Sequence, residues 1–592
     1  MLAFTPWGLL PAAVPLGWVT VRGLGALVLP RAGAQSVLAG ATLTVALIAV
    51  WVRLLGAVGL VTTWMLLGSL AVVAVAVVVA VRVRGLPWRL PWRRAVSAET
   101  VAVLVASAVA VVIAVVAGYY LPVWQWDALG YHLPYVNFAL QRGTLADLPS
   151  DMPYLSTYPH IVEYLFIAWR AMLPDDRLVD LAGVPLGLLC ALAVATIARG
   201  QGARIAHAVA AGAAWLTLPA VFLQLPTNYV DVAAAAFLLT AAAFLLGPLD
   251  VRRVLLAGVA IGLFLGAKPT ALLGAALLLA TLAFRARREG VLRWVAPAVV
   301  LTTVLGAETY VVNLIRHANP IWPVRVDVGA VHLPGTHTMS ELLASGANTP
   351  RTHGNPLQRV VESWTTVFPP LPVFDMRVGG LGLVFLIALP FAVVRAVRAR
   401  SVTAALVAAA SLAVPDPSIA RFVLGFAGLV VALAVPCVGH IRKPVQWAVF
   451  GVVALAAAQS VAVAYPGLHG EGPPLTAYPR MDLAERQRAV GADGSPAPFL
   501  DAIAHVRPGE ITVFDRSAEL PYYAWPFDLS RDAQRIPDDA TADYVRRIID
   551  DPRVRMLIVG DDTVAGAAVR ADPRFAFQFH CRTGTCTVYL RR

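Results

Sequence analysis

The residues best suited to chemistry gather in one polar stretch that directly follows a long apolar run. Residues 119–134 read YYLPVWQWDALGYHLP and place Asp127 eight positions after Tyr119. A carboxylate within reach of a hydroxyl can remove its proton as the oxygen attacks an electrophilic carbon. Asp is also favoured as the N-cap of a helix, and a short helix here would put Tyr131 one turn beyond Asp127. An acid and His132 beside several aromatic residues favour the chemical role.

The aromatic residues of this stretch admit two interpretations. Trp124, Trp126, Tyr131 and Tyr135 can stack on the faces of sugar rings. They can equally form the aromatic belt found at membrane–water interfaces, and that second interpretation is sufficient for most of them.

A second group of candidates lies farther along the same polar segment. Residues 155–169 have the apolar spacing of an amphipathic helix lying on the bilayer, with Tyr158 near its start. His160 and Glu163 are three residues apart and would share one face, a spacing that can bind a metal ion. Because no third ligand is evident, metal binding stays undecided: a divalent cation is open as a cofactor, and no other cofactor is predicted.

The composition identifies the elements that must position these residues. Hydrophobic residues make up 58% of the 592-residue chain, charged residues make up 14%, and the mean hydropathy is +0.71. Soluble domains carry about 25% charged residues, so we predict an α-helical polytopic membrane protein. These numbers exclude a coiled coil and a disordered chain, and four cysteines are too few for a disulfide scaffold.

The net charge of +12 does not indicate nucleic acid as a partner. The arginines collect in short clusters between apolar runs, which is how membrane proteins mark their cytoplasmic side. The partner that this pattern predicts is the lipid bilayer.

A membrane span needs about 20 apolar residues, and the apolar runs predict about 13 spans. Residues 5–30 are a further candidate, weakened by Pro11, Pro15 and Arg22, and whether they span the membrane is left open. The runs are 36–52, 56–81, 97–118, 181–199, 203–223, 230–248, 252–267, 270–285, 294–312, 377–394, 401–414, 420–437 and 445–464.

The basic clusters agree with one orientation. If residues 82–94 lie inside, alternation of the spans places every later basic loop inside as well. These loops hold Arg82, Arg84, Arg89, Arg93 and Arg94; Arg199 and Arg204; Arg252 and Arg253; Arg285, Arg287, Arg288 and Arg293; Arg395, Arg398 and Arg400; and Arg442 and Lys443. We therefore predict a multi-pass protein of the plasma (inner) membrane, with the candidate site and the C-terminal region extracytoplasmic.

This orientation predicts the organisation of the chain. Its parts are N-terminal spans (1–118), a first extracytoplasmic loop with the acidic motif (119–180), a transmembrane core (181–312), a second large loop (313–376), further spans (377–464), a linker (465–500) and an α/β domain (501–592).

The small α/β domain is predicted from its short apolar runs. Residues 511–514 and 556–559 suit buried strands, and residues 540–549 between them have helical spacing. Residues 575–579 and 587–590 alternate as edge strands do.

The four cysteines fall into two pairs. Cys581 and Cys586 are five residues apart around a turn, where an oxidising compartment favours a disulfide; the alternative is two free thiols. Cys190 and Cys437 lie in spans and are predicted to be core residues.

Four stretches resemble motifs of the GT-C superfamily of membrane glycosyltransferases. The similarity is to the bacterial branch related to dolichyl-phosphate-mannose protein mannosyltransferases and lipid A aminoarabinose transferases. WDALGYHLP (126–134) looks like the signature of that branch's first outer loop, and TNYVD (227–231) resembles its second acidic motif. GAKPT (266–270) resembles its short lysine turn, and NLIRHANPIWP (313–323) resembles the start of its second large loop. Arg421 and Phe422 after a later outer loop add support.

The resemblance implies transfer of a sugar from a polyprenyl-phosphate carrier to an acceptor on the outer side, with inversion of the anomeric carbon. Asp127 matches the position of the family's acidic base, and Asp231 is implied to position base or acceptor. Cations near the phosphate, for which Lys268, Arg316 and Arg421 are candidates, would stabilise developing charge. The remaining candidates for substrate binding are Tyr131, His132, Tyr158, His160, Glu163 and Asn313.

Each of these residues also has a structural interpretation. Asp231 can be a helix N-cap, and Lys268 can extend to lipid headgroups. Asn313 and Arg316 can cap the end of a span, and Arg421 can pair with Asp416.

The chain departs from the family in its extra apolar length before the signature. It also lacks a tight pair of adjacent carboxylates in the first loop, which leaves metal dependence open. The predicted function is thus a polyprenyl-phosphate-dependent glycosyltransferase with a cell-envelope glycan, lipid or protein as acceptor. Two alternatives stay open: a flippase for lipid-linked saccharides, and a catalytically inactive glycan-binding relative.

Overall fold

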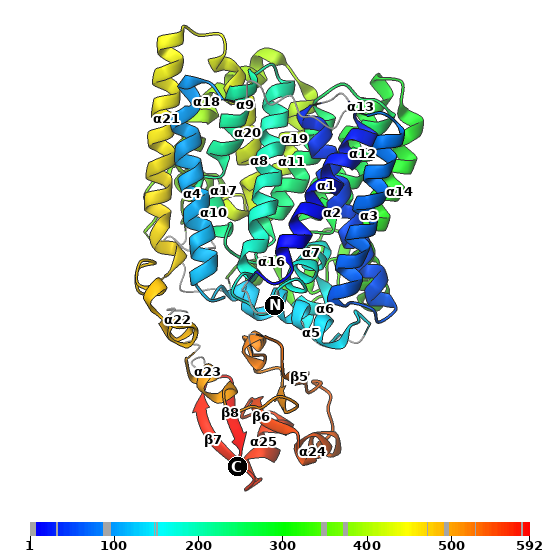
Figure 1. The fold of residues 1–592 in the computed structure, drawn as a ribbon, viewed down its shortest axis with the longest axis vertical. Helices are drawn as coiled ribbons and strands as arrows, with labels where there is room; N and C mark the ends of the chain where they lie inside the picture. The colour runs from blue at the N-terminus through cyan, green and yellow to red at the C-terminus, as the bar shows by residue number, and fades with distance from the viewer. Residues whose placement is uncertain are drawn as a thin grey trace.

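The computed structural model describes residues 7–30, 33–86, 96–146, 148–149, 152–344, 352–370, 377–470, 472–489, 497–526, 528–581 and 584–592. A large bundle of apolar helices carries a small α/β domain at one end (Figure 1). The predicted fold class, a helical membrane bundle with a small C-terminal α/β domain, is confirmed.

Every predicted apolar run contains a helix. The bundle helices are α1 (Leu10–Val28), α2 (Ala34–Ala57), α3 (Thr63–Val83), α4 (Val101–Tyr120), α8 (Gly183–Gly200), α9 (Ile205–Trp215), α10 (Pro219–Gln224), α11 (Asp231–Leu245), α12 (Val251–Leu265), α13 (Ala271–Arg288), α14 (Val295–Gly306), α15 (Glu308–His317), α18 (Gly382–Ala399), α19 (Val402–Leu412), α20 (Leu424–Val438) and α21 (Lys443–Ala464).

Fewer helices pass a strict test of length and hydropathy than the predicted span count. Within the described ranges, eight helices are long and apolar enough to cross a membrane, and the bent pair α14–α15 makes a ninth at most. α9, α11 and α19 are apolar but shorter. Short helices can still span where neighbours bury them or the bilayer thins, so the count of about 13 stays a prediction. α1, from the undecided residues 5–30, passes the test.

Two of the predicted runs are broken. Residues 203–223 form α9 and α10 because Pro219 opens the second helix and disfavours helical geometry in the residue before it. The run 294–312 bends by 68° between α14 and α15, beside Gly306. A Cβ at Gly306 would lie 2.2 Å from the carbonyl oxygen of Gly262, so only glycine allows α12 and α14 to approach this closely.

Contacts between loops test the predicted grouping of the two ends. At one end, Arg395 donates to the carbonyl of Gln201 (2.6 Å) and Arg252 to the carbonyl of Val28 (2.9 Å). At the other end, Trp124 in the first long loop donates to the carbonyl of Leu468 after the last bundle helix (3.1 Å). These contacts bring the basic loop at 395–400 beside the one at 199–204, as predicted, and the loop at 252–253 beside the end of α1. A common end for all the basic loops stays a prediction, and Arg89, Arg93 and Arg94 lie outside the described residues. Which end faces the cytoplasm remains a prediction.

The first long loop is a compact helical layer across the end of the bundle. After one turn of π-helix (Ala128–His132) come α5 (Leu133–Arg142), α6 (Pro153–Thr157), α7 (Ile161–Arg170) and a 3-10 turn (Val179–Ala182). The second long loop holds a small sheet of order β2-β1-β3, formed by β1 (Val324–Val328), β2 (Val331–Leu333) and β3 (His337–Thr338), with α16 (Met339–Ala344) and α17 (Pro356–Thr365).

The predicted amphipathic helix 155–169 is wrong in two respects. The helix begins only at Ile161, because Tyr158 is extended (ψ 152°) before Pro159, as the residue preceding a proline prefers. α7 is also buried over most of its length against α2 and α5, so it does not lie on a bilayer surface.

The C-terminal domain is a five-stranded sheet of order β5-β4-β6-β8-β7, parallel on its first three strands and antiparallel beyond. Its elements are α22 (Leu483–Ala489), α23 (Ala497–Ile503), β4 (Ile511–Phe514), β5 (Asp532–Arg535), α24 (Ala542–Asp550), β6 (Val554–Val559), α25 (Val564–Arg570), β7 (Phe575–His580) and β8 (Thr587–Arg591). The predicted buried runs are the inner strands β4 and β6. Of the two predicted edge strands, β7 lies at the edge of the sheet, whereas β8 lies between β6 and β7. α22 and the first part of α23 lie in the segment predicted to be a linker.

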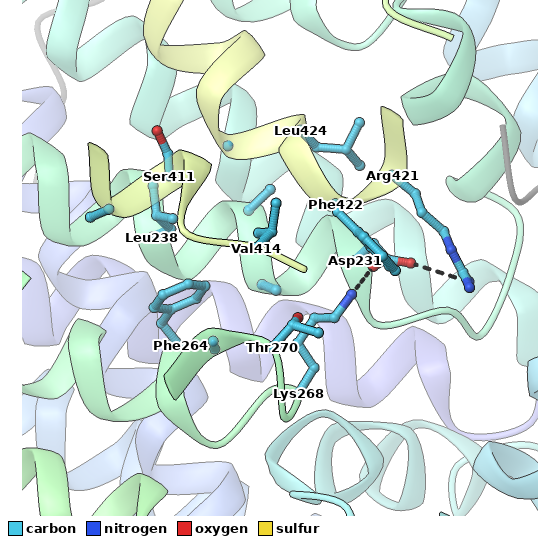
Figure 2. A pocket seen from close by; sticks show the side chains of 15 residues that line it. Asp231, Leu238, Phe264, Lys268, Thr270, Ser411, Val414, Arg421, Phe422 and Leu424 are labelled. Carbon is cyan, nitrogen blue, oxygen red and sulfur yellow. Dashed lines mark hydrogen bonds and ion pairs between the residues drawn. The ribbon is translucent and has the colours of Figure 1, made fainter. Parts of the chain in front are cut away.

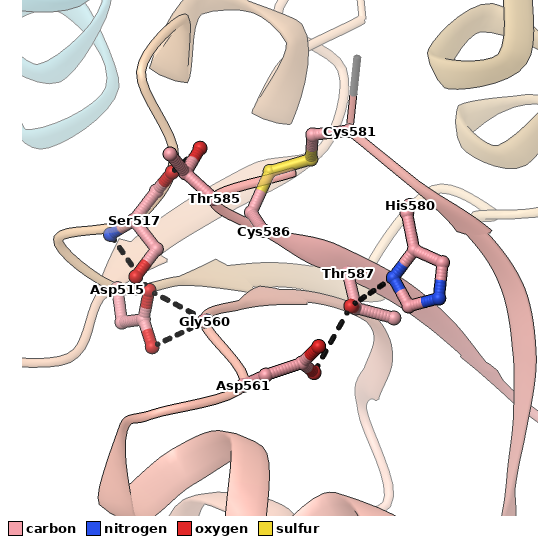
Figure 3. The surroundings of a disulfide bond; sticks show 9 residues. All are labelled: Asp515, Ser517, Gly560, Asp561, His580, Cys581, Thr585, Cys586 and Thr587. Atoms are coloured by element: carbon pink, nitrogen blue, oxygen red, sulfur yellow. Dashed lines mark hydrogen bonds between the residues drawn. A yellow bond between two sulfur atoms is a disulfide. The ribbon is translucent and has the colours of Figure 1, made fainter. Parts of the chain in front are cut away.

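Cys581 and Cys586 form the predicted disulfide at the turn of the β7–β8 hairpin (Figure 3). Beside it, the Thr585 hydroxyl donates to the carbonyl of Ser517 (3.2 Å) after β4. Cys190 is buried in α8, as predicted; Cys437 in α20 is half-buried, and both are free thiols.

Candidate active site

Four charged side chains from four parts of the chain meet beneath the first long loop. Asp127 stands just before the π-turn, Asp231 is the first residue of α11, Lys268 lies in the turn between α12 and α13, and Arg421 lies in a 3-10 turn before α20. Arg421 donates to Asp127 Oδ2 (2.8 Å) and its Nη1 lies 3.8 Å from Asp231 Oδ2. Lys268 Nζ pairs with Asp231 Oδ1. Figure 2 shows Lys268 and Arg421 reaching Asp231 from different sides.

The structure decides the alternatives for the two acids. Among the described residues, Asp127 caps no backbone amide of the turn that follows it; its carboxylate turns to Arg421 instead. Asp231 lies inside the first turn of α11 rather than at the cap position. Its Oδ2 accepts from the Gln224 amide (3.3 Å), and its other oxygen pairs with Lys268. The N-cap interpretation is therefore wrong for both residues.

Lys268 turns inward instead of extending toward headgroups. The Tyr310 hydroxyl donates to the carbonyls of Leu265 and Lys268 (3.1 Å each), which fixes the turn. The ammonium lies 4.5 Å from the centroid of the Phe422 ring, where a cation–π contact adds to its pairing with Asp231. A charge at this depth needs a partner, and Asp231 is that partner.

A cavity of about 370 Å³, including its open mouth, begins at these charges. Asp231, Lys268 and Arg421 line its polar end. Beyond them it runs between α11, α13, α19 and α20 over apolar and small side chains (Figure 2). These include Ala234, Ala235, Leu238, Phe264, Ala410 and Val414. The lining is therefore charged at one end and mainly apolar over the rest.

The four charges sum to zero. Two carboxylates face two cations, and the side chains are only 3% (Asp231), 13% (Lys268), 15% (Arg421) and 19% (Asp127) exposed. Burying charges is tolerable when they are paired in this way. Any anion that binds here would therefore compete with the carboxylates for the cations.

Three tyrosine rings gather next to Asp127. The centroid of the Tyr131 ring lies 5.7 Å from that of Tyr154 and 5.9 Å from that of Tyr158. Burial raises the pKa of Tyr131 and Tyr158, and the charge of Asp127 adds to both shifts. The phenols therefore stay neutral and offer hydrogen bonds beside the carboxylate. Tyr154, 41% exposed, is a residue that sequence reasoning missed; its place four residues before Tyr158 was the available signal.

His132, Glu163 and His160 support the loop instead of lining the cavity. His132 Nδ1 and Glu163 Oε1 are 2.6 Å apart and fully buried, which ties the π-turn to α7. His160 Nε2 contacts the carbonyl of Leu155 (2.8 Å), and the ring stacks on Tyr135 at 4.1 Å. Burial lowers the pKa of His160. The structure therefore does not bring these three residues to the cavity.

The predicted metal pair is also separated, because His160 and Glu163 have different partners. The part of the chain that the structure describes contains no group of three or more His, Cys, Asp or Glu side chains suited to a metal ion. A divalent cation as cofactor is thus left without an assigned set of ligands.

Of the three predicted phosphate ligands, two converge. Lys268 and Arg421 meet at Asp231, whereas Arg316 is exposed on α15. Asn313 is buried and donates to the carbonyl of Thr157 (2.8 Å), so it joins the second long loop to the first. Asp416 accepts from Arg359 (3.1 Å) and from Ser418 (2.6 Å), while Arg421 reaches the acids of the site.

Comparisons of the sequence gave no match to a protein-family model and no match to a curated protein. Comparison of the structure did. ArnT from Cupriavidus metallidurans in the apo state superposes with a TM-score of 0.51 at 15% identity, covering 83% of this chain and 98% of ArnT. ArnT bound to undecaprenyl phosphate superposes with a TM-score of 0.50 at 14% identity, covering 82% of this chain and 97% of ArnT. An oligosaccharyltransferase from Archaeoglobus fulgidus superposes with a TM-score of 0.38 at 15% identity, covering 77% of this chain and 69% of the oligosaccharyltransferase.

The helical bundle, the layered first loop and the C-terminal α/β domain define a multi-pass membrane protein whose fold is similar to that of ArnT. The similarity extends over nearly the whole of ArnT's length. The resemblance inferred from four short motifs is thereby confirmed at the level of the fold.

Proposed function

We propose that this protein is a membrane glycosyltransferase that moves a sugar from a polyprenyl-phosphate donor to an extracytoplasmic acceptor. The observation that carries the proposal is the cavity, whose lining joins two largely buried cations to apolar side chains and which lies beside a carboxylate. The structure of ArnT with undecaprenyl phosphate supports a lipid phosphate as the ligand. The sugar, the acceptor and the exact lipid stay unassigned.

In this proposal each charged residue has one task. Lys268 and Arg421 hold the phosphate and stabilise the negative charge that grows on it as the glycosidic bond breaks. Asp127 accepts the proton of the acceptor hydroxyl. The acceptor oxygen forms the new bond to the anomeric carbon from the face opposite the phosphate. The bond between that carbon and the phosphate oxygen breaks, and the lipid phosphate leaves with the electron pair, which inverts the sugar.

The ion pairs suggest how the donor prepares the base. Arg421 donates to Asp127 at 2.8 Å. A phosphate that binds Arg421 competes with this contact and releases Asp127 toward the acceptor. Asp231 keeps Lys268 oriented throughout.

The transfer reaction is the direct test. Purified protein is incubated with a panel of labelled polyprenyl-phosphate sugars and envelope acceptors, and product is scored together with donor binding. We expect label to leave the lipid from at least one donor. A flippase would bind and move a donor without cleaving it. Binding without cleavage across the panel would therefore contradict the proposal.

The predicted orientation gives a second test. A cysteine placed at exposed Glu485 in α22 should react with a membrane-impermeant maleimide in intact cells. A cysteine at exposed Arg287, at the end of α13 in the basic end of the bundle, should react only after lysis. The unsubstituted protein, with Cys190 and Cys437, gives the background. The reverse labelling pattern would place the site and the C-terminal domain inside the cell.

A further inference from the structure

The C-terminal domain contacts the same piece of chain that carries Asp127. Asp127, the π-turn Ala128–His132 and α5 form one continuous segment. A Cβ at Gly130 in the turn would lie 3.8 Å from the carbonyl oxygen of Glu519. The short segment Glu519–Trp525, between β4 and β5, thus lies directly against the turn.

One amide side chain on α5 fastens the domain. Gln141 Oε1 accepts from the Trp525 indole (2.7 Å) and from the backbone amide of Ala533 (3.2 Å). Its Nε2 donates to the carbonyl of Ala533 (3.2 Å). Ala533 lies in β5, an edge strand whose outer groups would otherwise lack partners. Gln141 therefore completes the edge of the sheet with the geometry of a neighbouring strand.

Aromatic packing surrounds this polar contact. The Phe138 ring on α5 meets the Trp525 ring edge-on at 4.7 Å and lies 6.1 Å from the Phe514 ring. Phe138 and Phe514 are fully buried and Trp525 is 3% exposed. The Tyr522 hydroxyl donates to Asp176 Oδ2 (2.6 Å), which links the domain to the far end of the first loop. Domains that move apart usually meet through more polar contacts.

We infer that the C-terminal domain is a fixed positioning element of the active-site loop, with Gln141 as the positioning residue, and that it stays docked during turnover. This inference rests on the proposed function for its effect on rate. The docking itself does not depend on which reaction is catalysed. A small displacement of Asp127 would misalign the base, and misplacements of about 1 Å can cost roughly 100-fold in rate.

The first test uses Gln141→Ala in the full-length protein. We expect turnover to fall roughly 10- to 100-fold. Affinity for the polyprenyl phosphate should be unchanged, because Lys268 and Arg421 are held by the bundle. Hydrogen exchange of the backbone amides in residues 128–132 should accelerate. Gln578→Ala, at an exposed glutamine on β7, is the matched control. It should leave turnover, affinity for polyprenyl phosphate and hydrogen exchange unchanged.

A crosslink tests whether the C-terminal domain stays docked or has to open during turnover. Arg142→Cys at the end of α5 and Asp532→Cys at the start of β5 flank the Gln141–Ala533 contact and can be joined by a short, cleavable bismaleimide. If the domain stays docked, turnover of the crosslinked protein should be within twofold of that of the uncrosslinked protein. Loss of turnover on crosslinking, restored by cleavage, would show that the domain must open and would overturn the inference.

The contact at Asp176 adds a pH signature. Burial raises the pKa of Asp176 to about 7, although Tyr522 and Arg170 oppose the shift; Asp175 and Asp180 are the other charges that face it. A released Asp176 would titrate near 3.8. The docked state therefore favours the protonated acid. Docking weakens as the pH rises from about 4 to 7, and its strength does not change further above pH 7.

Exchange of residues 128–132 reads this directly and needs no activity. After division by the intrinsic rate of base-catalysed exchange at each pH, the protection of these amides should fall across that pH range in the natural protein and stay constant in Asp176→Asn. If no sugar transfer is ever found, exchange still tests the docking. Unchanged exchange in both Gln141→Ala and Trp525→Ala would overturn the inference even if transfer is demonstrated.

Discussion

Asp127→Asn is expected to lower the turnover of sugar transfer by ~100- to 10,000-fold, the usual cost of losing a general base. Asparagine has the same size but cannot accept the proton of a hydroxyl. The protein should still insert and fold, because Asp127 is 19% exposed and caps no backbone amide among the described residues. Steady-state transfer from a verified donor, with folding checked by thermal unfolding, measures the effect.

The same variant has a second signature. Arg421 loses the carboxylate that now competes with the donor, so affinity for polyprenyl phosphate should be equal or tighter. Asp175→Asn is the matched control, because Asp175 lies in the same loop and pairs with Arg177 at 2.6 Å away from the cavity residues. It should keep turnover within about twofold. Weaker donor binding with near-normal turnover would instead make Asp127 a structural anchor for Arg421.

Much of the arrangement could be predicted from the sequence because it depends on local patterns. Apolar runs located the helices, and the arginine clusters grouped the loops by end, since charge asymmetry acts on each loop separately. The motifs around Asp127, Asp231 and Lys268 identified three of the four charges that meet. Arg421 was the weakest of these predictions, and its contact with Asp127 spans 294 positions of sequence. No local pattern encodes such a contact.

What the sequence did not predict depends on shape. The break before His160 was encoded by Pro159, but the burial of α7 required knowledge of what covers it. His132 and Glu163 looked like polar residues available to substrate, and only the packing shows that they bind each other. The docking of Trp525 on Gln141 joins two surfaces that fold separately in the chain. Complementarity of this kind has no periodicity to detect.

Lys268→Met is the second large-effect variant, and it needs a partner variant to be interpreted. The ion pair with Asp231 is buried, and removing one member of a buried pair typically costs about 3–5 kcal/mol because the other charge is left unpaired. Lys268→Met alone is therefore expected to lower both stability and turnover. The double variant Asp231→Asn with Lys268→Met removes both charges and should recover most of the stability.

The double variant separates the two possible roles of Lys268. If the lysine holds the donor phosphate, affinity for polyprenyl phosphate stays low in the double variant although the fold has recovered. If the lysine only neutralises Asp231, donor affinity and turnover should recover with stability. Arg285→Met is the matched control, because Arg285 pairs with Glu289 at the opposite end of the bundle and is similarly buried. It should lower stability without changing donor affinity. Lys268→Met alone lowers turnover whether the lysine binds the phosphate or only neutralises Asp231. The donor affinity of the double variant therefore decides whether Lys268 belongs to the phosphate site.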